Sequence, residues 1–102
     1  MFDVDGTLIS NTNGLGQEHL NINTFQLLVL LSKMKNVSIN VWSGGGKEYA
    51  EQIVKKYGLT QYIENCYGKH EYDESIDGRP DIAFEDIHSF NMADKNVIVR
   101  CK

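Results

Sequence analysis

The chain has 102 residues, of which 41% are hydrophobic and 24% are charged, a composition typical of one folded globular domain over residues 1–102. Its formal net charge of −4 argues against a dedicated nucleic-acid-binding protein, because neutralising phosphates requires clustered Lys and Arg. No apolar run reaches the ~18 residues of a membrane span, and the acidic N-terminus is unlike a signal peptide, so we expect a cytoplasmic protein with no membrane contact.

The first predicted elements are a strand and a helix. Residues 1–4 form a short apolar strand that an Asp-Gly turn ends, and residues 10–23 form a polar loop. A helix follows, with Asn23 as its N-cap and Gln26 as its capping-box partner. Apolar residues occupy nearly all sides of this helix from position 25 to position 34, so we expect it to be heavily buried.

Strands and helices continue to alternate along the rest of the chain. Strands are predicted over residues 37–42, 66–67, 82–84 and 97–99. A second helix begins after Gly46, has apolar residues at helical spacing, and ends before Gly58. This order predicts an α/β fold, a Rossmann-like three-layer sandwich with a mainly parallel five-stranded sheet and helices on both faces.

Polar side chains lie at or just past the ends of four predicted strands. They are Asp3 and Asp5, Ser43, Lys69, and Glu85 and Asp86. In parallel sheets, ligands bind beyond the carboxyl ends of the strands. We therefore expect these residues to meet at one edge of the sheet.

The segment Asp3-Val4-Asp5-Gly6-Thr7 carries the most specific signal. Residues two apart in an extended chain share one side, and Gly6 lets the chain turn sharply after them. One carboxylate can attack phosphorus, while the other protonates the leaving oxygen and later takes a proton from water. The alternative is a plain strand and turn, but four fixed positions match by chance in fewer than about one chain in a thousand.

Four segments resemble the motifs of the haloacid dehalogenase superfamily in order and spacing. DVDGTL resembles its first motif, DxDGT, and VWSGG, YGKH and PDIAFED resemble its second, third and fourth motifs. The resemblance extends over essentially the whole chain. It implies a minimal core without a cap domain and a Mg²⁺-dependent phosphatase that works through an aspartyl-phosphate intermediate.

The resemblance also implies roles for the matching acidic residues. Asp3 is the nucleophile and a Mg²⁺ ligand. Asp5 is the general acid/base and binds the metal through its backbone carbonyl. Glu85 and Asp86 complete the metal site, and Asp86 is favoured as the direct ligand because its side chain is shorter. Glu85 departs from the family, which commonly has Asp there.

The remaining roles concern the phosphoryl group. The resemblance makes Ser43 and Lys69 catalytic and substrate-binding residues, and we add Thr7, Gly44 and Gly45 as substrate-binding residues. Backbone N–H groups of the Ser43–Gly46 loop at a helix start suit an anion, although such a loop can also be only a turn. Lys47 is the competitor of Lys69, which could otherwise be a solvated loop lysine.

Three functions stay open from the sequence. The first is a phosphomonoester hydrolase, favoured because Asp5 is present. The second is a catalytically weak binding or regulatory module, and the third is a phosphatase for nucleotide or nucleic-acid ends, which the net charge disfavours. Only Met1 and Phe2 precede Asp3, whereas the family usually has several apolar residues there, and the sequence leaves open whether residues are missing upstream.

The gaps between motifs are too short for a cap domain, so we expect an open site. The side chains expected to ring it are Asn11, Gln17, His70, Tyr72 and Arg79. A bulky or macromolecular phosphorylated substrate, or a second copy of the chain, would then cover the site. The cysteines, Cys66 and Cys101, have no metal-binding spacing and are expected to be reduced.

Overall fold

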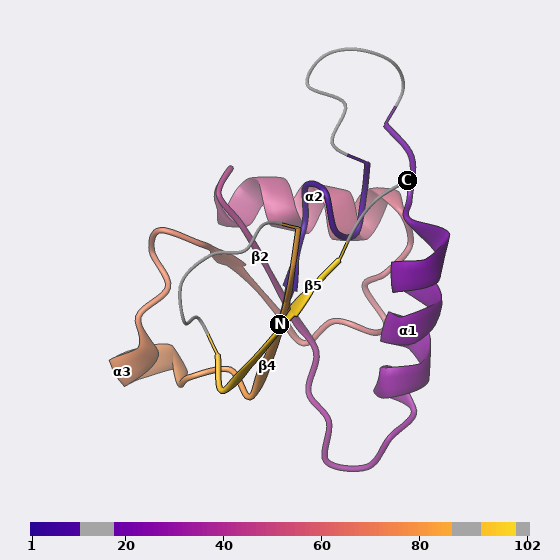
Figure 1. The fold of residues 1–102 in the computed structure, drawn as a ribbon. Coiled ribbons are helices and arrows are strands. Elements are labelled where there is room, and N and C mark those ends of the chain that lie inside the picture. Colours follow the sequence, from indigo (N-terminus) through magenta and orange to yellow (C-terminus); the bar gives the residue numbers. More distant parts are fainter. Residues whose placement is uncertain (11–17, 87–92, 100–102) are drawn as a thin grey trace.

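The structure, a computed structural model, describes residues 1–10, 18–86 and 93–99 (Figure 1). The described residues form strands β1 (Phe2–Asp3), β2 (Asn40–Ser43), β3 (Asn65–Gly68), β4 (Ile82–Glu85) and β5 (Lys95–Ile98), and helices α1 (Ile22–Ser32), α2 (Lys47–Lys56) and α3 (Glu74–Asp77). The sheet order is β3-β2-β1-β4-β5, and every strand pair is parallel. The predicted α/β, Rossmann-like fold with a five-stranded sheet is therefore confirmed.

The shortest strand, β1, lies at the centre of the sheet. Phe2 pairs with Val41 of β2 on one side and with Phe84 of β4 on the other. The strand ends at Asp3 rather than at residue 4, because the carbonyl of Val4 already accepts turn hydrogen bonds from the N–H groups of residues 7–9. The strand order reverses direction at β1, and in parallel sheets ligands bind beyond the carboxyl ends of the strands at such a point.

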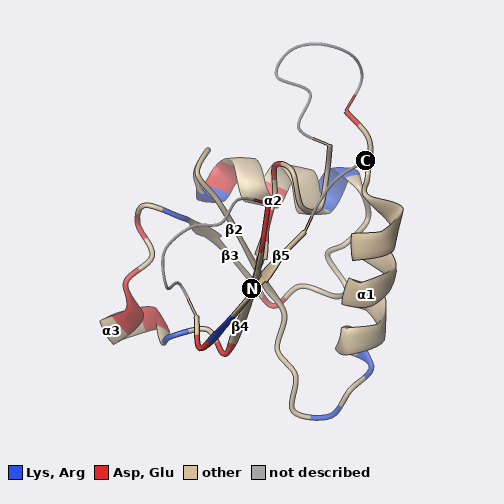
Figure 2. Cartoon of the chain, in the orientation of Figure 1, with Lys and Arg blue, Asp and Glu red and all other residues tan. Residues whose placement is uncertain are grey.

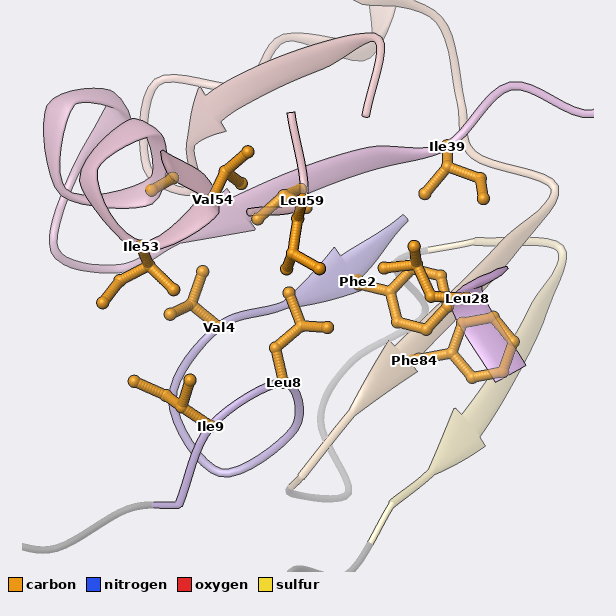
Figure 3. Close-up of a cluster of buried hydrophobic side chains, with 12 residues drawn as sticks. Phe2, Val4, Leu8, Ile9, Leu28, Ile39, Ile53, Val54, Leu59 and Phe84 are labelled. Atoms are coloured by element: carbon orange, nitrogen blue, oxygen red, sulfur yellow. The ribbon is translucent and has the colours of Figure 1, made fainter. Parts of the chain in front are cut away.

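The two faces of the sheet are covered unequally. On one face, α1 and α2 pack over a core of apolar side chains that includes Phe2, Val4, Leu28, Val41, Ile53, Val54 and Phe84 (Figure 3). The rings of Phe2 and Phe84 stack at 4.4 Å between centroids. On the other face, Trp42 and Ala83 are buried with Ala93 beneath Tyr72 of the β3–β4 connection. The layer on this face is therefore thin.

Helix α1 differs from its prediction in two ways. Its N-cap is Asn21, whose side chain accepts a hydrogen bond from the N–H of Thr24, two residues before the predicted cap. The expectation of a heavily buried helix is wrong, because Ile22 is 57% exposed and Leu30 is 63% exposed. The helix packs against the core along one side, where Leu28 is completely buried, and its uncharged outer side faces solvent (Figure 2).

The other helices begin and end for local reasons. Gly46 precedes α2 with a φ of 103°, and Gly58 follows it with a φ of 67°, a conformation that favours glycine after a helix. The short α3 lies in a stretch for which the sequence predicts no helix, and its N-cap is Asp73, whose side chain accepts from the N–H of Ser75. None of the helices within the described ranges has the length and apolar character needed to cross a membrane.

Candidate active site

The carboxyl edge of the sheet brings the predicted site residues together. Asp3, Ser43 and Glu85 are the last residues of β1, β2 and β4, and Lys69 and Asp86 directly follow β3 and β4. The N–H of Lys69 donates to the carbonyl of Ser43 at 2.8 Å, which ties the ends of β2 and β3 to each other. The parallel register thus brings four separate chain segments to the carboxyl end of β1.

Asp3 lies at the centre of this group and is only 6% exposed. The ammonium nitrogen of Lys69 lies 3.7 Å from its Oδ1. Burial, followed by the negative charge of Glu85, raises the pKa of Asp3 from 3.8 to about 8, and a hydrogen bond with Asp86 acts in the same direction. The charge of Lys69 opposes this rise. The acidic cluster therefore carries more negative charge than its one lysine balances.

Glu85 is tied to the protein by both carboxylate oxygens. Its Oε2 accepts a hydrogen bond of 2.8 Å from the indole Nε1 of Trp42, and its Oε1 pairs with the ammonium group of Lys69. That ammonium group also lies 5.8 Å from the centroid of the Trp42 ring, within cation–π range. Glu85 is 1% exposed, so these contacts hold Lys69 beside Asp3 from the interior of the protein.

Asp5 has a different partner. Its Oδ1 accepts a hydrogen bond of 2.8 Å from the phenol of Tyr49, which lies in the first turn of α2. Burial and the hydrogen bond to Asp5 raise the pKa of Tyr49, so the phenol keeps its proton at neutral pH. The side chain of Asp5 is thus oriented by α2 rather than by the strands.

The loop from Ser43 to Gly46 connects β2 to α2. The hydroxyl of Ser43 accepts a hydrogen bond of 3.0 Å from the N–H of Gly45, and the carbonyl of Ser43 accepts from the N–H of Gly46 at 3.1 Å. Gly44 and Gly45 are exposed, whereas Ser43 is buried. The loop therefore presents backbone at the surface of the site, above a hydroxyl that can still donate its own proton.

Two residues of the first motif lie below the surface. Gly6 has a φ of 81°, and a Cβ placed there would lie 2.3 Å from Oδ2 of Asp86, so only glycine allows the Asp86 carboxylate to take this position. Thr7 is completely buried, so its side chain offers no surface to a substrate in this structure.

The carboxylates fit Mg²⁺ as a pair. Mg²⁺ is usually held by one or two carboxylates, with water and substrate phosphate completing its shell. Asp3 and Asp86 supply two carboxylates in mutual contact, whereas both oxygens of Glu85 have protein partners. The described residues contain no group of three His, Cys, Asp or Glu arranged to hold a metal ion. The fit is therefore that of a two-carboxylate site, with the Asp5 carbonyl as the third donor that the motif implies.

The prediction that Arg79 and Tyr72 ring the site is wrong. Arg79 precedes β4, so it lies at the amino edge of the parallel sheet, where it pairs with Glu74 and Asp94. Tyr72 packs edge-on against Trp42 and lines a groove of about 430 Å³ at that same amino edge, away from Asp3. His70 does lie near the site, because a Cβ on Gly44 would be 3.8 Å from its Nε2.

Other expected residues lie outside the described parts of the chain. Asn11 and Gln17, which were expected in the ring, fall in this class, as does Cys101. Cys66 is a free thiol. Of the two candidate lysines, Lys69 makes the ion pairs with the acidic cluster, and Lys47 takes part in none of the ion pairs among the described residues.

The sequence analysis missed the two aromatic partners, Trp42 and Tyr49. The signal that could have identified them is their place in the motifs: Trp42 immediately precedes Ser43, and Tyr49 comes three residues after the glycine loop. Comparison with known proteins finds no family model, no curated protein and no solved structure that matches this chain.

Proposed function

We propose that this protein is a Mg²⁺-dependent phosphomonoester hydrolase whose nucleophile is Asp3. The observation that carries the proposal is the ammonium group of Lys69, 3.7 Å from Asp3 Oδ1 and anchored by the buried Glu85. A buried carboxylate beside a fixed cation, next to a loop of exposed backbone, suits attack on a group that brings its own negative charge.

The first chemical step uses Asp3 and Asp5. The carboxylate of Asp3 attacks phosphorus, forming a bond from its oxygen to phosphorus while the bond from phosphorus to the ester oxygen breaks. Asp5 gives its proton to that leaving oxygen, so the alcohol departs neutral. The second step reverses these roles: Asp5 takes a proton from water, the water oxygen bonds to phosphorus, and Asp3 is released with inorganic phosphate.

The other residues bind and neutralise the phosphoryl group. The ammonium group of Lys69 offsets negative charge on Asp3 and on the phosphoryl oxygens. The exposed backbone at Gly44 and the Ser43 hydroxyl offer donors to those oxygens, and the hydrogen bond from the Gly45 N–H holds the Ser43 oxygen in place. A bound Mg²⁺ would add positive charge that favours the ionised form of Asp3 and polarises the phosphoryl group. The exposed loop agrees with an open site that accepts a bulky phosphorylated substrate.

The test is direct trapping of the intermediate. Wild-type protein is mixed with an aryl phosphate and Mg²⁺, quenched in acid, digested, and examined by mass spectrometry for one phosphoryl group on Asp3. The Asp3→Asn variant serves as the control for adventitious labelling. Turnover in wild type together with labelling of Asp3 supports the proposal. A wild-type protein that binds Mg²⁺ but neither turns over nor becomes labelled would instead indicate a binding or regulatory module.

A further inference from the structure

The hydrogen bond from Tyr49 to Asp5 has no role in the two proposed steps of phosphoryl transfer. The Tyr49 phenol donates to Oδ1 of Asp5 at 2.8 Å, across 44 residues of sequence. Tyr49 is half-buried, and it belongs to a helix that starts directly after the loop from Ser43 to Gly46. The contact therefore connects the loop side of the site to the side chain proposed as its acid and base.

A second observation locates the Tyr49 ring independently. A Cβ built on Gly45 would lie 3.0 Å from Cδ2 of Tyr49 and 3.4 Å from Oγ of Ser43. The ring thus packs on the backbone of Gly45, and a larger residue at that position would have to displace it. Ring packing on the loop and the hydrogen bond to Asp5 together define where the phenol lies.

We infer that Tyr49 is a positioning residue that assigns separate tasks to the two oxygens of Asp5. This inference rests on the proposed hydrolase function. Because Oδ1 accepts from the phenol, the proton that Asp5 delivers is carried on Oδ2, and the carboxyl group is oriented before the substrate arrives. Tyr49 keeps its own proton throughout. The proton of Oδ2 goes to the leaving oxygen in the first step, and water returns one to Oδ2 in the second.

The role of Tyr49 in orienting Asp5 is expected to matter more for some substrates than for others. An alkyl phosphate has a poor leaving group and depends on delivery of a proton, whereas an aryl phosphate depends on it little. Tyr49 contacts neither Lys69 nor Asp86 among the hydrogen bonds and ion pairs of the described residues, so its removal leaves the nucleophile side unchanged. Loss of the phenol is therefore expected to act on kcat for alkyl phosphates and to leave KM unchanged.

The experiment compares Tyr49→Phe with the matched variant Tyr57→Phe. Tyr57 follows the last residue of α2 and also donates its phenol to a carboxylate, that of Glu18, at 2.6 Å. Both variants are assayed in Mg²⁺ with 4-nitrophenyl phosphate and with glycerol phosphate, in wild-type and Asp5→Asn backgrounds. We expect Tyr49→Phe to lower kcat for glycerol phosphate by roughly tenfold, a part of the 10²–10⁴-fold that acid catalysis contributes, and to change aryl turnover less than about threefold.

The outcomes separate this inference from the proposed function. A Tyr49→Phe effect that is selective for the alkyl substrate, disappears in the Asp5→Asn background and is not produced by Tyr57→Phe supports the positioning role. Equal losses on both substrates, a loss that persists without the Asp5 carboxylate, or wild-type behaviour would overturn it while leaving the hydrolase proposal intact. A wild type that hydrolyses neither substrate and forms no phospho-Asp3 would overturn both.

Discussion

Trp42 and Glu85, 43 residues apart in sequence, are joined by a hydrogen bond of 2.8 Å from the indole Nε1 to the carboxylate Oε2. Both side chains are almost completely buried. A buried carboxylate needs partners for its charge, and Glu85 finds them in Trp42 and Lys69. This pairing makes Glu85 part of the support of the site rather than a free acidic ligand.

Removal of the indole donor is expected to destabilise the fold. Trp42→Phe keeps an aromatic ring but leaves Oε2 of Glu85 without that hydrogen bond, which costs about 1–3 kcal/mol for a buried acceptor. Urea denaturation followed by far-UV circular dichroism measures the loss, because Trp42 is the only tryptophan and its fluorescence disappears with it. In a Glu85→Gln background, Trp42→Phe should lower the free energy of unfolding by less. An unchanged loss would mean that the smaller volume of the phenylalanine ring, and not the lost hydrogen bond, destabilises the fold.

Lys69→Ala is expected to lower both turnover and stability. Loss of a solvated loop lysine would hardly affect folding, but Lys69 is the partner of the buried Glu85. Removing one partner of a fully buried pair costs roughly 3–5 kcal/mol, and the 19% exposure of the Lys69 side chain reduces this figure. The Lys69→Ala/Glu85→Gln double variant should regain stability without regaining activity, and Lys47→Ala is the control. A loss of turnover in Lys47→Ala and not in Lys69→Ala would assign the role to Lys47.

Glu85 and Asp86 are expected to contribute differently to Mg²⁺ binding. Asp86→Asn removes the carboxylate that contacts Asp3, whereas Glu85→Gln changes one already paired with Trp42 and Lys69. Calorimetric titration with Mg²⁺ should therefore show a much weaker affinity for Asp86→Asn than for Glu85→Gln. The reverse order would assign the ligand to Glu85.

Asp3→Asn should abolish turnover and also change how stability depends on pH. The pKa of Asp3 is raised from 3.8 to about 8 in the folded protein, so between these values the folded state holds a proton that the unfolded chain has released. Stability in chelator therefore falls as the pH rises through this window, and the variant, which cannot ionise at residue 3, should show a smaller fall. Thermal midpoints across the pH range measure this. Identical slopes, or equal stabilisation of both proteins by Mg²⁺, would contradict it.

Gly6→Ala should disrupt the metal site through Asp86. The substitution combines a φ of 81° with a Cβ 2.3 Å from Asp86 Oδ2, whereas Gly78 has a similar φ of 88° with nothing within 4 Å. Gly78→Ala therefore isolates the backbone strain, of order 1 kcal/mol. Denaturation and Mg²⁺ titration should show a larger loss of stability for Gly6→Ala and loss of Mg²⁺ affinity for that variant alone. Equal effects of the two substitutions would mean that the contact with Asp86 is unimportant.

The predictions that succeeded rest on local pattern, and those that failed rest on tertiary context. Alternating strands and helices imply a parallel sheet, and a parallel sheet brings the carboxyl ends of its strands to one edge, so the meeting of Asp3, Ser43 and Lys69 was predictable. The burial of α1 was not, because an apolar sequence does not tell how many of its sides have a partner. By sequence Asn23 is the better N-cap because Gln26 can complete a capping box, but the N–H of Asn21 donates to the carbonyl of Leu8 in the turn after β1, and the helix begins there.

The order of the functional groups along the chain can be seen in the sequence alone: two carboxylates follow the first strand, a serine and glycines the second, a lysine the third and an acidic pair the fourth. The hydrogen-bond and ion-pair partners of these groups become known from the fold. Trp42 and Tyr49 lie far in sequence from Glu85 and Asp5, the acids to which they donate. Whether Glu85 or Asp86 turns inward depends on packing on the face of the sheet that carries Trp42. Hydrogen bonds between distant residues depend on distances of a fraction of an ångström, which residue spacing along a chain does not specify.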